Sequence, residues 1–273
     1  MSKYIEMKKF AANIRKETLK MLLKRGFGHL GGAMSIVETL AVLYSRMDVD
    51  PKNPKKADRD YLVLSKGHAG PALYSTLALK GFFDLEVLGT LNNNGTILPS
   101  HPDRNLTPGI DMTTGSLGQG ISAAVGIALG LHRDNSPKKV YSIVGDGELN
   151  EGQCWEAVQL AAHNKLNNFV LFVDDNKKQL DGTTTEICNA FDFVKKFESF
   201  GFDTVRVDGA SVEAIDKALD TQKDMPLCIV LDTTKGQGVK YFEELKANHH
   251  IRFNDEQKEV LKAEISKLEK EAE

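Results

Sequence analysis

The sequence predicts an α/β fold, in which helices cover both faces of a doubly wound, mainly parallel sheet. Short apolar segments of strand length alternate with longer segments of helical periodicity, and this alternation is typical of parallel sheets. Hydrophobic residues make up 41% of the 273 residues, which is enough for a substantial core. No internal repeat or low-complexity linker interrupts the pattern, so we expect residues 1–273 to form a single domain.

Two helices are expected near the start of the chain. Apolar residues at helical spacing predict an amphipathic helix over residues 3–25, closed by Gly26. Ser35, followed three residues later by Glu38, matches a capping box. This motif predicts a helix that runs from there through Met47.

The rest of the chain predicts strands and helices in regular alternation, with one long interruption. The interruption is a loop over residues 92–114, rich in Asn, Gly, Pro and Thr, and its length indicates a functional role. Strands are expected at 61–64, 139–144, 168–174, 203–207 and 227–232, and helices up to about residue 81 and at 118–132, 151–165, 189–200, 211–222 and 254–272.

Composition and charge exclude several classes of function. A formal charge of -3 and a pI near 6.2 give no basic footprint for nucleic acid. No apolar run reaches membrane-spanning length, and the polar N-terminus lacks the apolar core of a signal peptide. The isolated cysteines Cys154, Cys188 and Cys228 favour free thiols over disulfides or a zinc site. We therefore expect a cytoplasmic protein.

The most informative local feature is an apolar strand that ends in Gly145-Asp146-Gly147. In doubly wound sheets, ligands bind beyond the carboxyl ends of the strands. Gly147 would let backbone N–H groups approach a phosphate, and the helix that begins a few residues later adds favourable partial charge. Asp146 offers a hard anionic oxygen suited to magnesium or calcium. The motif therefore indicates a phosphate and metal site.

The next predicted strand ends in Asp174-Asp175-Asn176. If the two strands are neighbours, Asp146 and Asn176 project into the same crevice. A carboxylate and a neutral amide leave a divalent metal net positive, so that it can hold a diphosphate. Either motif alone is more typical of a tight turn or a helix cap. The pairing of the two motifs, separated by a helix and a strand, favours the metal site.

With these motifs in place, the sequence resembles the thiamine-diphosphate enzymes, and transketolase in particular. The blocks that carry the resemblance are the run from Gly145 to Gly152 through Trp155 to Asp175-Asn176, GHLGG from Gly28, SKGH from Ser65, SHP from Ser100, TTGSLGQG from Thr113 and QLDGT from Gln179. They follow one another in order from about residue 10 to 255. Several ordered blocks are more specific than any single motif.

The resemblance implies two cofactors, thiamine diphosphate and Mg²⁺ or Ca²⁺. The metal would be held by Asp146, by the Asn176 side chain and by the backbone carbonyl of Lys178. The diphosphate would lie against the Gly147 amide and His68. Asn176 would thus belong to both the metal site and the cofactor site.

The resemblance also implies contacts with the rest of the cofactor and with the substrate. The backbone at Gly115 and Leu117 would touch the aminopyrimidine ring. His29, His101 and His249 would line the substrate channel and contact sugar hydroxyls and the developing oxyanion. A single histidine in a Gly-rich loop is more often a surface or capping residue, but several in matching blocks favour a site. Neutral imidazoles both donate and accept, which suits a polyhydroxy substrate and proton transfer.

The sequence departs from the family pattern at a few positions. Leu30 and Ser116 stand where prolines are usual, and we expect only a change in local stiffness. The family often has Trp-His-Gly at its last substrate histidine, whereas this chain has Asn248-His249-His250. We align His249 with the family's histidine, and His250 remains the alternative.

The resemblance implies a function that needs a second chain. In the family, a following domain supplies a glutamate that activates thiamine, and no such domain follows residue 273 in this sequence. We expect the N-terminal subunit of a split transketolase, active only with a separate C-terminal subunit that carries the pyrimidine-binding domain, in a heterotetramer. Together they would transfer a two-carbon ketol unit between sugar phosphates, from a ketose to an aldose.

Other interpretations stay open. The α subunit of a 2-oxoacid dehydrogenase first component shares Gly-Asp-Gly but lacks the histidines at 29, 68 and 101. A relative of deoxyxylulose-phosphate synthase would decarboxylate pyruvate. A non-catalytic subunit that keeps the fold and the cofactor is an alternative of a different class. An unrelated nucleotide-binding domain is disfavoured, because the phosphate-loop fingerprint is absent.

Overall fold

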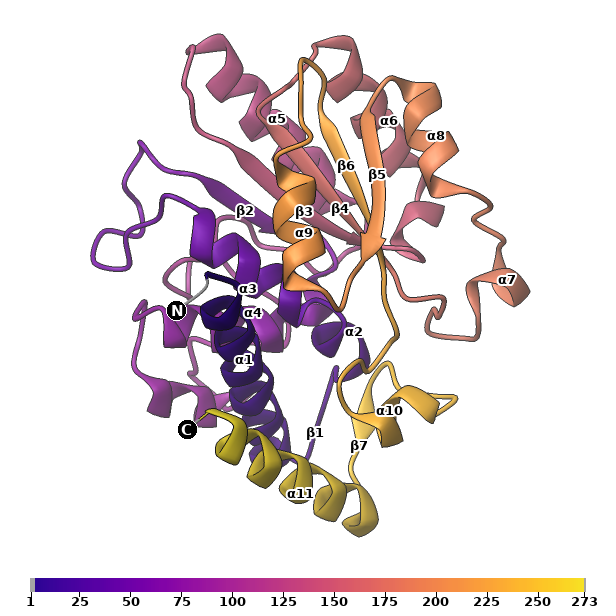
Figure 1. Cartoon of the computed structure of the whole chain (residues 1–273). Helices are drawn as coiled ribbons and strands as arrows, with labels where there is room; N and C mark the ends of the chain where they lie inside the picture. The colour runs from indigo at the N-terminus through magenta and orange to yellow at the C-terminus, as the bar shows by residue number, and fades with distance from the viewer. Residues whose placement is uncertain (1–2, 273) are drawn as a thin grey trace.

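The computed structural model describes residues 3–272, and a five-stranded sheet forms its centre (Figure 1). In spatial order, the strands are β2 (Tyr61–Leu64), β3 (Val140–Gly145), β4 (Phe169–Asp175), β6 (Leu227–Asp232) and β5 (Asp203–Asp208). All neighbouring strands in this sheet are parallel. The predicted α/β fold class is therefore confirmed.

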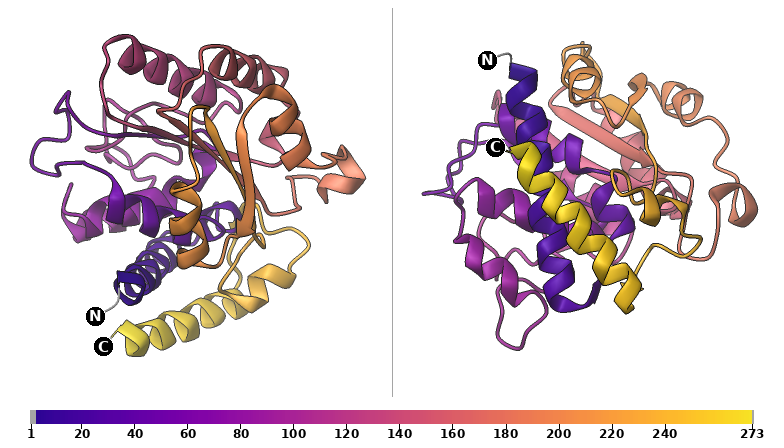
Figure 2. Two further views of the ribbon diagram at one scale, coloured as in Figure 1. Left: turned by 45° about the horizontal axis from the view of Figure 1, so that its top comes forward. Right: turned by 60° about the horizontal axis from the view of Figure 1, so that its bottom comes forward.

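Helices cover both faces of the sheet (Figures 1 and 2). One face carries α5 (Gln119–Arg133), α6 (Gly152–His163) and α8 (Phe193–Phe200). The other face carries α1 (Lys3–Arg25), α3 (Val37–Arg46), α4 (Gly70–Leu79) and α9 (Val212–Leu219). The helix α11 (Asp255–Ala272) packs on α1. Alternate residues of a strand enter opposite cores, as in β4, where Phe172 packs on the α1 side and Leu171 on the α5 side. The central strands β3, β4 and β6 are therefore largely apolar, whereas the edge strand β5 is partly exposed and carries Asp203, Arg206 and Asp208.

The chain reverses its direction across the sheet between β4 and β6. From β4 it passes to the edge strand β5 and then returns to place β6 between them. Because parallel crossovers are right-handed, the reversal puts α8 and α9 on opposite faces. The loops after β4 and β6 consequently diverge, and they leave a crevice at the carboxyl edge.

The remaining elements are short. They are the helices α2 (Gly31–Met34), α7 (Thr184–Ile187) and α10 (Lys240–Glu244), the 3-10 helices η1 (Gly67–Ala69), η2 (Leu85–Thr90) and η3 (Glu148–Asn150), and the strands β1 (Phe27–Gly28) and β7 (Ile251–Arg252). The strands β1 and β7 form an antiparallel ribbon, in which Phe27 pairs with Arg252. Strands of two residues are too short to show periodicity, so the sequence does not predict them.

The predicted capping box at Ser35 is wrong. The helix α3 begins at Val37, and the residue before it makes no side-chain capping bond. The Ser35 hydroxyl instead donates a 2.7 Å hydrogen bond to the Asp174 carboxylate. Glu38 forms a buried ion pair with Arg15 on α1, at 2.6 Å. Both side chains thus serve tertiary contacts, which the local motif could not indicate.

The other predicted helices and strands are present, with small shifts in their ends. The helix expected from residue 189 begins only at Phe193, where the Asp192 side chain caps it by accepting a 2.9 Å hydrogen bond from the Val194 N–H. Within residues 3–272, the helices are all too short or too polar to cross a membrane.

Candidate active site

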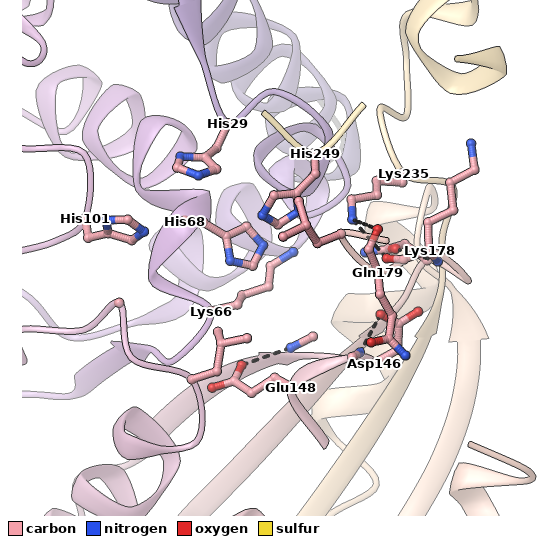
Figure 3. Close-up of a pocket in the computed structure, with 16 residues that line it drawn as sticks. His29, Lys66, His68, His101, Asp146, Glu148, Lys178, Gln179, Lys235 and His249 are labelled. Atoms are coloured by element: carbon pink, nitrogen blue, oxygen red, sulfur yellow. Dashed lines mark hydrogen bonds between the residues drawn. The ribbon is translucent and has the colours of Figure 1, made fainter. Parts of the chain in front are cut away.

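A cavity of about 230 Å³ opens at the carboxyl edge of the sheet (Figure 3). Every residue assigned to the site from the sequence lines it: His29, His68, His101, Gly115, Leu117, Asp146, Gly147, Asn176, Lys178 and His249. Of the two adjacent candidates near the end of the chain, His249 belongs to this lining and His250 is exposed outside it. Residues from distant parts of the sequence thus converge on one space.

Asp146 and Asn176 meet at the adjacent ends of β3 and β4. Gly145 lies opposite Asp174 in the parallel register, so the residues that follow the two strands emerge together. The Asp146 carboxylate accepts a 2.7 Å hydrogen bond from the backbone N–H of Lys177, which directly follows Asn176. The two side chains expected to share a metal therefore border the same cavity.

The fully buried carboxylate of Asp174 fixes the orientation of the Asn176 side chain. Asp174 accepts a 2.7 Å hydrogen bond from the Asn176 Nδ2. Because a carboxylate only accepts, the amide nitrogen must face Asp174, and Oδ1 faces away from it. Burial alone would raise the pKa of Asp174, but contact with the buried Lys66 ammonium holds that pKa below its ordinary value. The anion that orients Asn176 is thus maintained.

Asp146 is a carboxylate in unfavourable surroundings. Burial raises the pKa of Asp146 to about 7, and the nearby Asp174 carboxylate adds to the rise. The hydrogen bonds that Asp146 accepts from Gly147 and Lys177 only partly offset these effects. A divalent cation would stabilise the ionised form, because it brings opposite charge to a poorly solvated anion.

The oxygen atoms around this point fit a hard cation. They are the Asp146 carboxylate, the Asn176 amide oxygen and the Lys178 carbonyl, which are the donor types that Mg²⁺ and Ca²⁺ prefer. Among the described residues, no group of three or more His, Cys, Asp or Glu side chains could hold a metal. The rest of a coordination shell would therefore come from ligand oxygens and water.

The Lys178 carbonyl already has a cationic partner. The Lys235 ammonium, from the loop after β6, donates to it at 2.9 Å and to the Gln179 carbonyl at 3.3 Å. Burial lowers the pKa of Lys235 to about 8. A metal could bind this carbonyl oxygen through the second lone pair of the oxygen, or after Lys235 moves away. The crevice at the switch between β4 and β6 thus holds positive charge suited to an anion.

The backbone of Gly147 approaches the same region. Its N–H donates a 2.7 Å hydrogen bond to the Asp146 carboxylate, so contact with a diphosphate would require this hydrogen to be shared or redirected. A Cβ atom on Gly147 would lie 3.0 Å from the Gln179 side chain. A side chain at residue 147 would therefore crowd the cavity wall.

Imidazole rings form the opposite wall of the cavity (Figure 3). The ring of His29 lies 5.3 Å from that of His101 and 5.4 Å from that of His249, between centroids. The rings of His68 and His249 are 4.6 Å apart. Four separate segments of the chain supply these side chains, and together they present ring nitrogens to one space.

These imidazoles are neutral near pH 7. Burial lowers the pKa of His29 to about 4 and that of His249 to about 3, and neighbouring groups lower both further. Burial also lowers the pKa of His101, and it lowers the pKa of His68 well below its ordinary value. In the described part of the chain, the buried Nδ1 of His249 has no hydrogen-bond partner. Neutral rings of this kind can donate and accept toward a hydroxylated ligand.

The carboxylate of Glu148 forms hydrogen bonds with three segments that border the cavity. It accepts hydrogen bonds from the Ser65 hydroxyl at 2.5 Å, the Gly118 N–H at 2.9 Å and the Gly145 N–H at 3.2 Å. The loop that carries Leu117 is thereby held against the end of β3. The backbone groups expected to meet the aminopyrimidine ring are consequently fixed before any ligand binds.

Sequence reasoning missed the charged cavity residues Lys66, Glu148 and Lys235. Each follows the carboxyl end of a strand, β2, β3 or β6, within three residues. The same rule that selected Asp146 could therefore have selected them. Without the strand order, however, the sequence does not show which of these strand ends lie side by side.

The fold and the cavity together define an α/β protein whose switch point can hold a metal and an anionic cofactor. Comparison with known families agrees: the chain belongs to the transketolase family, whose model "Transketolase, thiamine diphosphate binding domain" matches residues 6–268. The predicted thiamine-diphosphate-binding fold is thereby confirmed.

The chain is similar to several proteins of the same length that are named as transketolase subunits. It is 48% identical over 271 residues to the 6-deoxy-6-sulfo-D-fructose transketolase subunit SqwG of Clostridium sp. (strain MSTE9), with 98% of each chain covered. It is 38% identical over 265 residues to an apulose-4-phosphate transketolase subunit of Phocaeicola vulgatus, with 94% of each covered. The predicted resemblance to the N-terminal subunit of a split transketolase is confirmed.

Whole transketolases match only in part. The crystal structure of the Campylobacter jejuni enzyme superposes with a TM-score of 0.88 at 33% identity, over 95% of this chain and 43% of that one. Human transketolase is 35% identical over 247 residues, which are 89% of this chain and 39% of the human protein. The chain therefore spans less than half the length of these enzymes.

Proposed function

We propose that this chain is the N-terminal subunit of a two-subunit transketolase, in which residues 1–273 act as one thiamine-diphosphate-binding domain. With a separate C-terminal subunit, in a heterotetramer, it would transfer a two-carbon ketol unit from a ketose phosphate to an aldose phosphate. The convergence of Asp146, Asn176 and neutral imidazoles on one cavity supports this most directly. The free thiols of Cys154, Cys188 and Cys228 agree with a cytoplasmic location.

The cofactor would be anchored at the carboxyl edge of the sheet. Asp146, the Asn176 Oδ1 and the Lys178 carbonyl would hold Mg²⁺ or Ca²⁺, while Lys235 and His68 would face the diphosphate. When bound, thiamine diphosphate supplies a carbon nucleophile and an electron sink for carbon–carbon cleavage.

The imidazoles would bind the sugar by hydrogen bonds and would transfer protons at its reacting oxygens. His29, His101 and His249 are neutral near pH 7, so each can accept a hydrogen bond from one hydroxyl and donate one to another oxygen. Proton transfer at the reacting oxygens then needs only small movements of hydrogens between fixed rings. The carboxylate that activates thiamine would come from the partner chain, as the family resemblance implies.

Reconstitution tests the proposal. A tagged form of the chain captures its partner, which is identified by mass spectrometry and purified separately. We expect ketol transfer from mixtures of the two chains with thiamine diphosphate and Mg²⁺, and a rate lower by several orders of magnitude from either chain alone. Full turnover by the chain alone would reject the split arrangement.

The same assay separates the alternative enzymes. A 2-oxoacid dehydrogenase subunit or a deoxyxylulose-phosphate synthase would release carbon dioxide from a 2-oxo acid such as pyruvate. We expect no decarboxylation by the reconstituted pair. Cofactor binding without either reaction would favour a non-catalytic subunit.

A further inference from the structure

One buried amide side chain, that of Asn248, lies next to the cavity lining. Asn248 is 2% exposed, whereas the two residues before it, Lys246 and Ala247, are exposed. It directly precedes His249, which lines the cavity (Figure 3). Because a buried amide without hydrogen bonds is costly, the contacts of Asn248 show what holds this segment in place.

The side-chain nitrogen of Asn248 binds two backbone carbonyls from other segments. It donates hydrogen bonds to the carbonyls of Lys235 and Phe242, each at 2.8 Å. Lys235 belongs to the loop after β6, and Phe242 belongs to α10, whose last carbonyls have no partner within so short a helix. An amide nitrogen carries two hydrogens, so these contacts use both of them.

The backbone of Asn248 binds a third segment, the one that carries His29. The Asn248 carbonyl accepts a 3.0 Å hydrogen bond from the Gly31 N–H. The approach is close, because a Cβ atom on Gly31 would lie 2.4 Å from that carbonyl oxygen and 2.8 Å from the Lys235 Cγ. The Gly31 carbonyl in turn accepts a 3.0 Å hydrogen bond from the Gly236 N–H. Asn248 thus joins three segments that each supply a side chain to the cavity.

Two cavity side chains depend on these contacts for their position. The Lys235 ammonium reaches the Lys178 carbonyl at 2.9 Å from a backbone that the Asn248 amide holds. The buried Nδ1 of His249 has no hydrogen-bond partner within residues 3–272, so no bond at that nitrogen orients the ring. The position of the His249 ring therefore depends on the backbone next to it, which Asn248 anchors.

We propose that Asn248 is a positioning residue, which keeps the Lys235 ammonium and the His249 ring at fixed places around the bound cofactor and sugar. This role rests on the proposed function, and it adds a residue that acts through two others. The family often has Trp at this position, and an indole, with a single N–H, could not donate to both carbonyls. The paired contacts therefore depend on the Asn of this chain.

The link to Lys235 is tested by calorimetric titration of the full chain with thiamine diphosphate in the presence of Mg²⁺. We expect Asn248→Ala to weaken binding roughly tenfold, because the ammonium is no longer held beside the anion. In a Lys235→Ala background, the same change should have less than about a twofold effect, because the two residues act through one contact. Asn248→Asp keeps the size of the side chain but removes both donors, so it should repeat the loss without a packing defect.

The link to His249 is tested in the reconstituted two-chain enzyme at saturating thiamine diphosphate. The donor is fructose 6-phosphate or, if the enzyme rejects it, 6-deoxy-6-sulfofructose, with one aldose acceptor held constant. We expect Asn248→Ala to lower kcat/KM roughly tenfold, and by less than about twofold in a His249→Ala background. Asn248→Ser, a milder change that keeps a hydroxyl donor, should lose less, and it replaces Asn248→Ala if that variant does not fold.

Asn168→Ala is the matched control. Asn168 is 6% exposed, and its side-chain nitrogen donates a 2.9 Å hydrogen bond to the Ala128 carbonyl on α5, outside the cavity lining. The variant should lower the unfolding midpoint and leave both readouts unchanged. Equal losses in Asn168→Ala and Asn248→Ala, or an undiminished effect of Asn248→Ala in either background, would overturn the positioning role. If the unmodified chain does not bind thiamine diphosphate, the proposed function itself fails.

Discussion

Opposing effects act on the pKa of the Asp146 carboxyl group. Burial and the Asp174 carboxylate raise its pKa, while hydrogen bonds from two backbone N–H groups lower it. The sequence predicts the type and the place of this residue, because an acidic residue after a buried strand is a recognisable pattern. It could not predict the orientation of the Asn176 amide, which depends on a buried carboxylate and its distant lysine partner.

The metal assignment predicts a loss of cofactor affinity in Asp146→Asn. We expect Mg²⁺-dependent binding of thiamine diphosphate to the isolated chain to weaken at least tenfold (an order-of-magnitude figure), because a neutral amide replaces an anionic ligand. Isothermal titration calorimetry measures this directly. Asp232→Asn, at the exposed end of β6, is the matched control. Equal affinity in both variants would reject the metal site.

The histidine wall predicts a loss of stability in acid. The pKa of His29 is about 4 in the folded chain, below the ordinary value of 6.5. Between pH 4 and 6.5, the folded chain therefore binds fewer protons at His29 than the unfolded chain does. The stability associated with its neutral form is therefore intact above pH 6.5 and is lost as the pH falls toward 4. When the pH falls from 7 to 4.5, the free energy of unfolding should decrease by about 1 kcal/mol less in His29→Gln than in the unmodified chain. This figure allows for the partial exposure of His29.

Urea unfolding at the two pH values measures the effect at His29. His163→Gln, at the exposed end of α6, should leave the pH dependence unchanged. An identical pH dependence in the unmodified chain and His29→Gln would contradict the assignment of the acid sensitivity to the buried His29 ring.

At the level of elements, periodicity predicts each strand of the main sheet and most of the long helices. It could not supply the order of the strands, since β6 lies between β4 and β5 through contacts far apart in the sequence. The capping-box motif at Ser35 failed for a related reason. Its hydroxyl donates to Asp174, which is buried at the end of β4, and tertiary contact prevailed over a local signal.

The Asp174 carboxylate joins several elements, and its removal should destabilise the chain. It accepts hydrogen bonds from Ser35 at 2.7 Å and Thr233 at 2.5 Å, and it pairs with the buried Lys66. Asp174→Ala leaves that ammonium buried without its counter-charge, so we expect a loss of about 3 to 5 kcal/mol in the free energy of unfolding. Asp232→Ala should cost under about 1 kcal/mol. Similar losses in both would show that the buried network contributes little.

At the scale of the whole molecule, the segment between β4 and α8 leaves large apolar side chains in solvent. Leu180, Ile187 and Phe191 are 65%, 48% and 78% exposed, and Leu180 also lines the cavity. Large apolar side chains exposed to solvent in one segment of a chain are typical of a surface that another protein covers. Because similar proteins of this length are named as transketolase subunits, a partner subunit is the occupant that we expect on this surface.

We therefore expect Phe191→Ser to weaken assembly with the partner chain roughly tenfold and to leave the unfolding midpoint of the isolated chain unchanged. Sedimentation of the mixed chains measures the assembly. Leu85→Ser is the control, because Leu85 is 45% exposed at the start of η2, outside the cavity lining. An unchanged association constant would place the interface elsewhere.

The antiparallel pairing of β1 with β7 brings together the chain segments that carry the cavity residues His29 and His249. A ribosome-bound chain exposes its first histidine motif early, yet the strand β7, which pairs with β1 beside this motif, is synthesised only after all strands of the main sheet. Long-range pairing of this kind forms late, after many intervening residues have been made. We therefore expect nascent chains that end before β7 not to bind thiamine diphosphate.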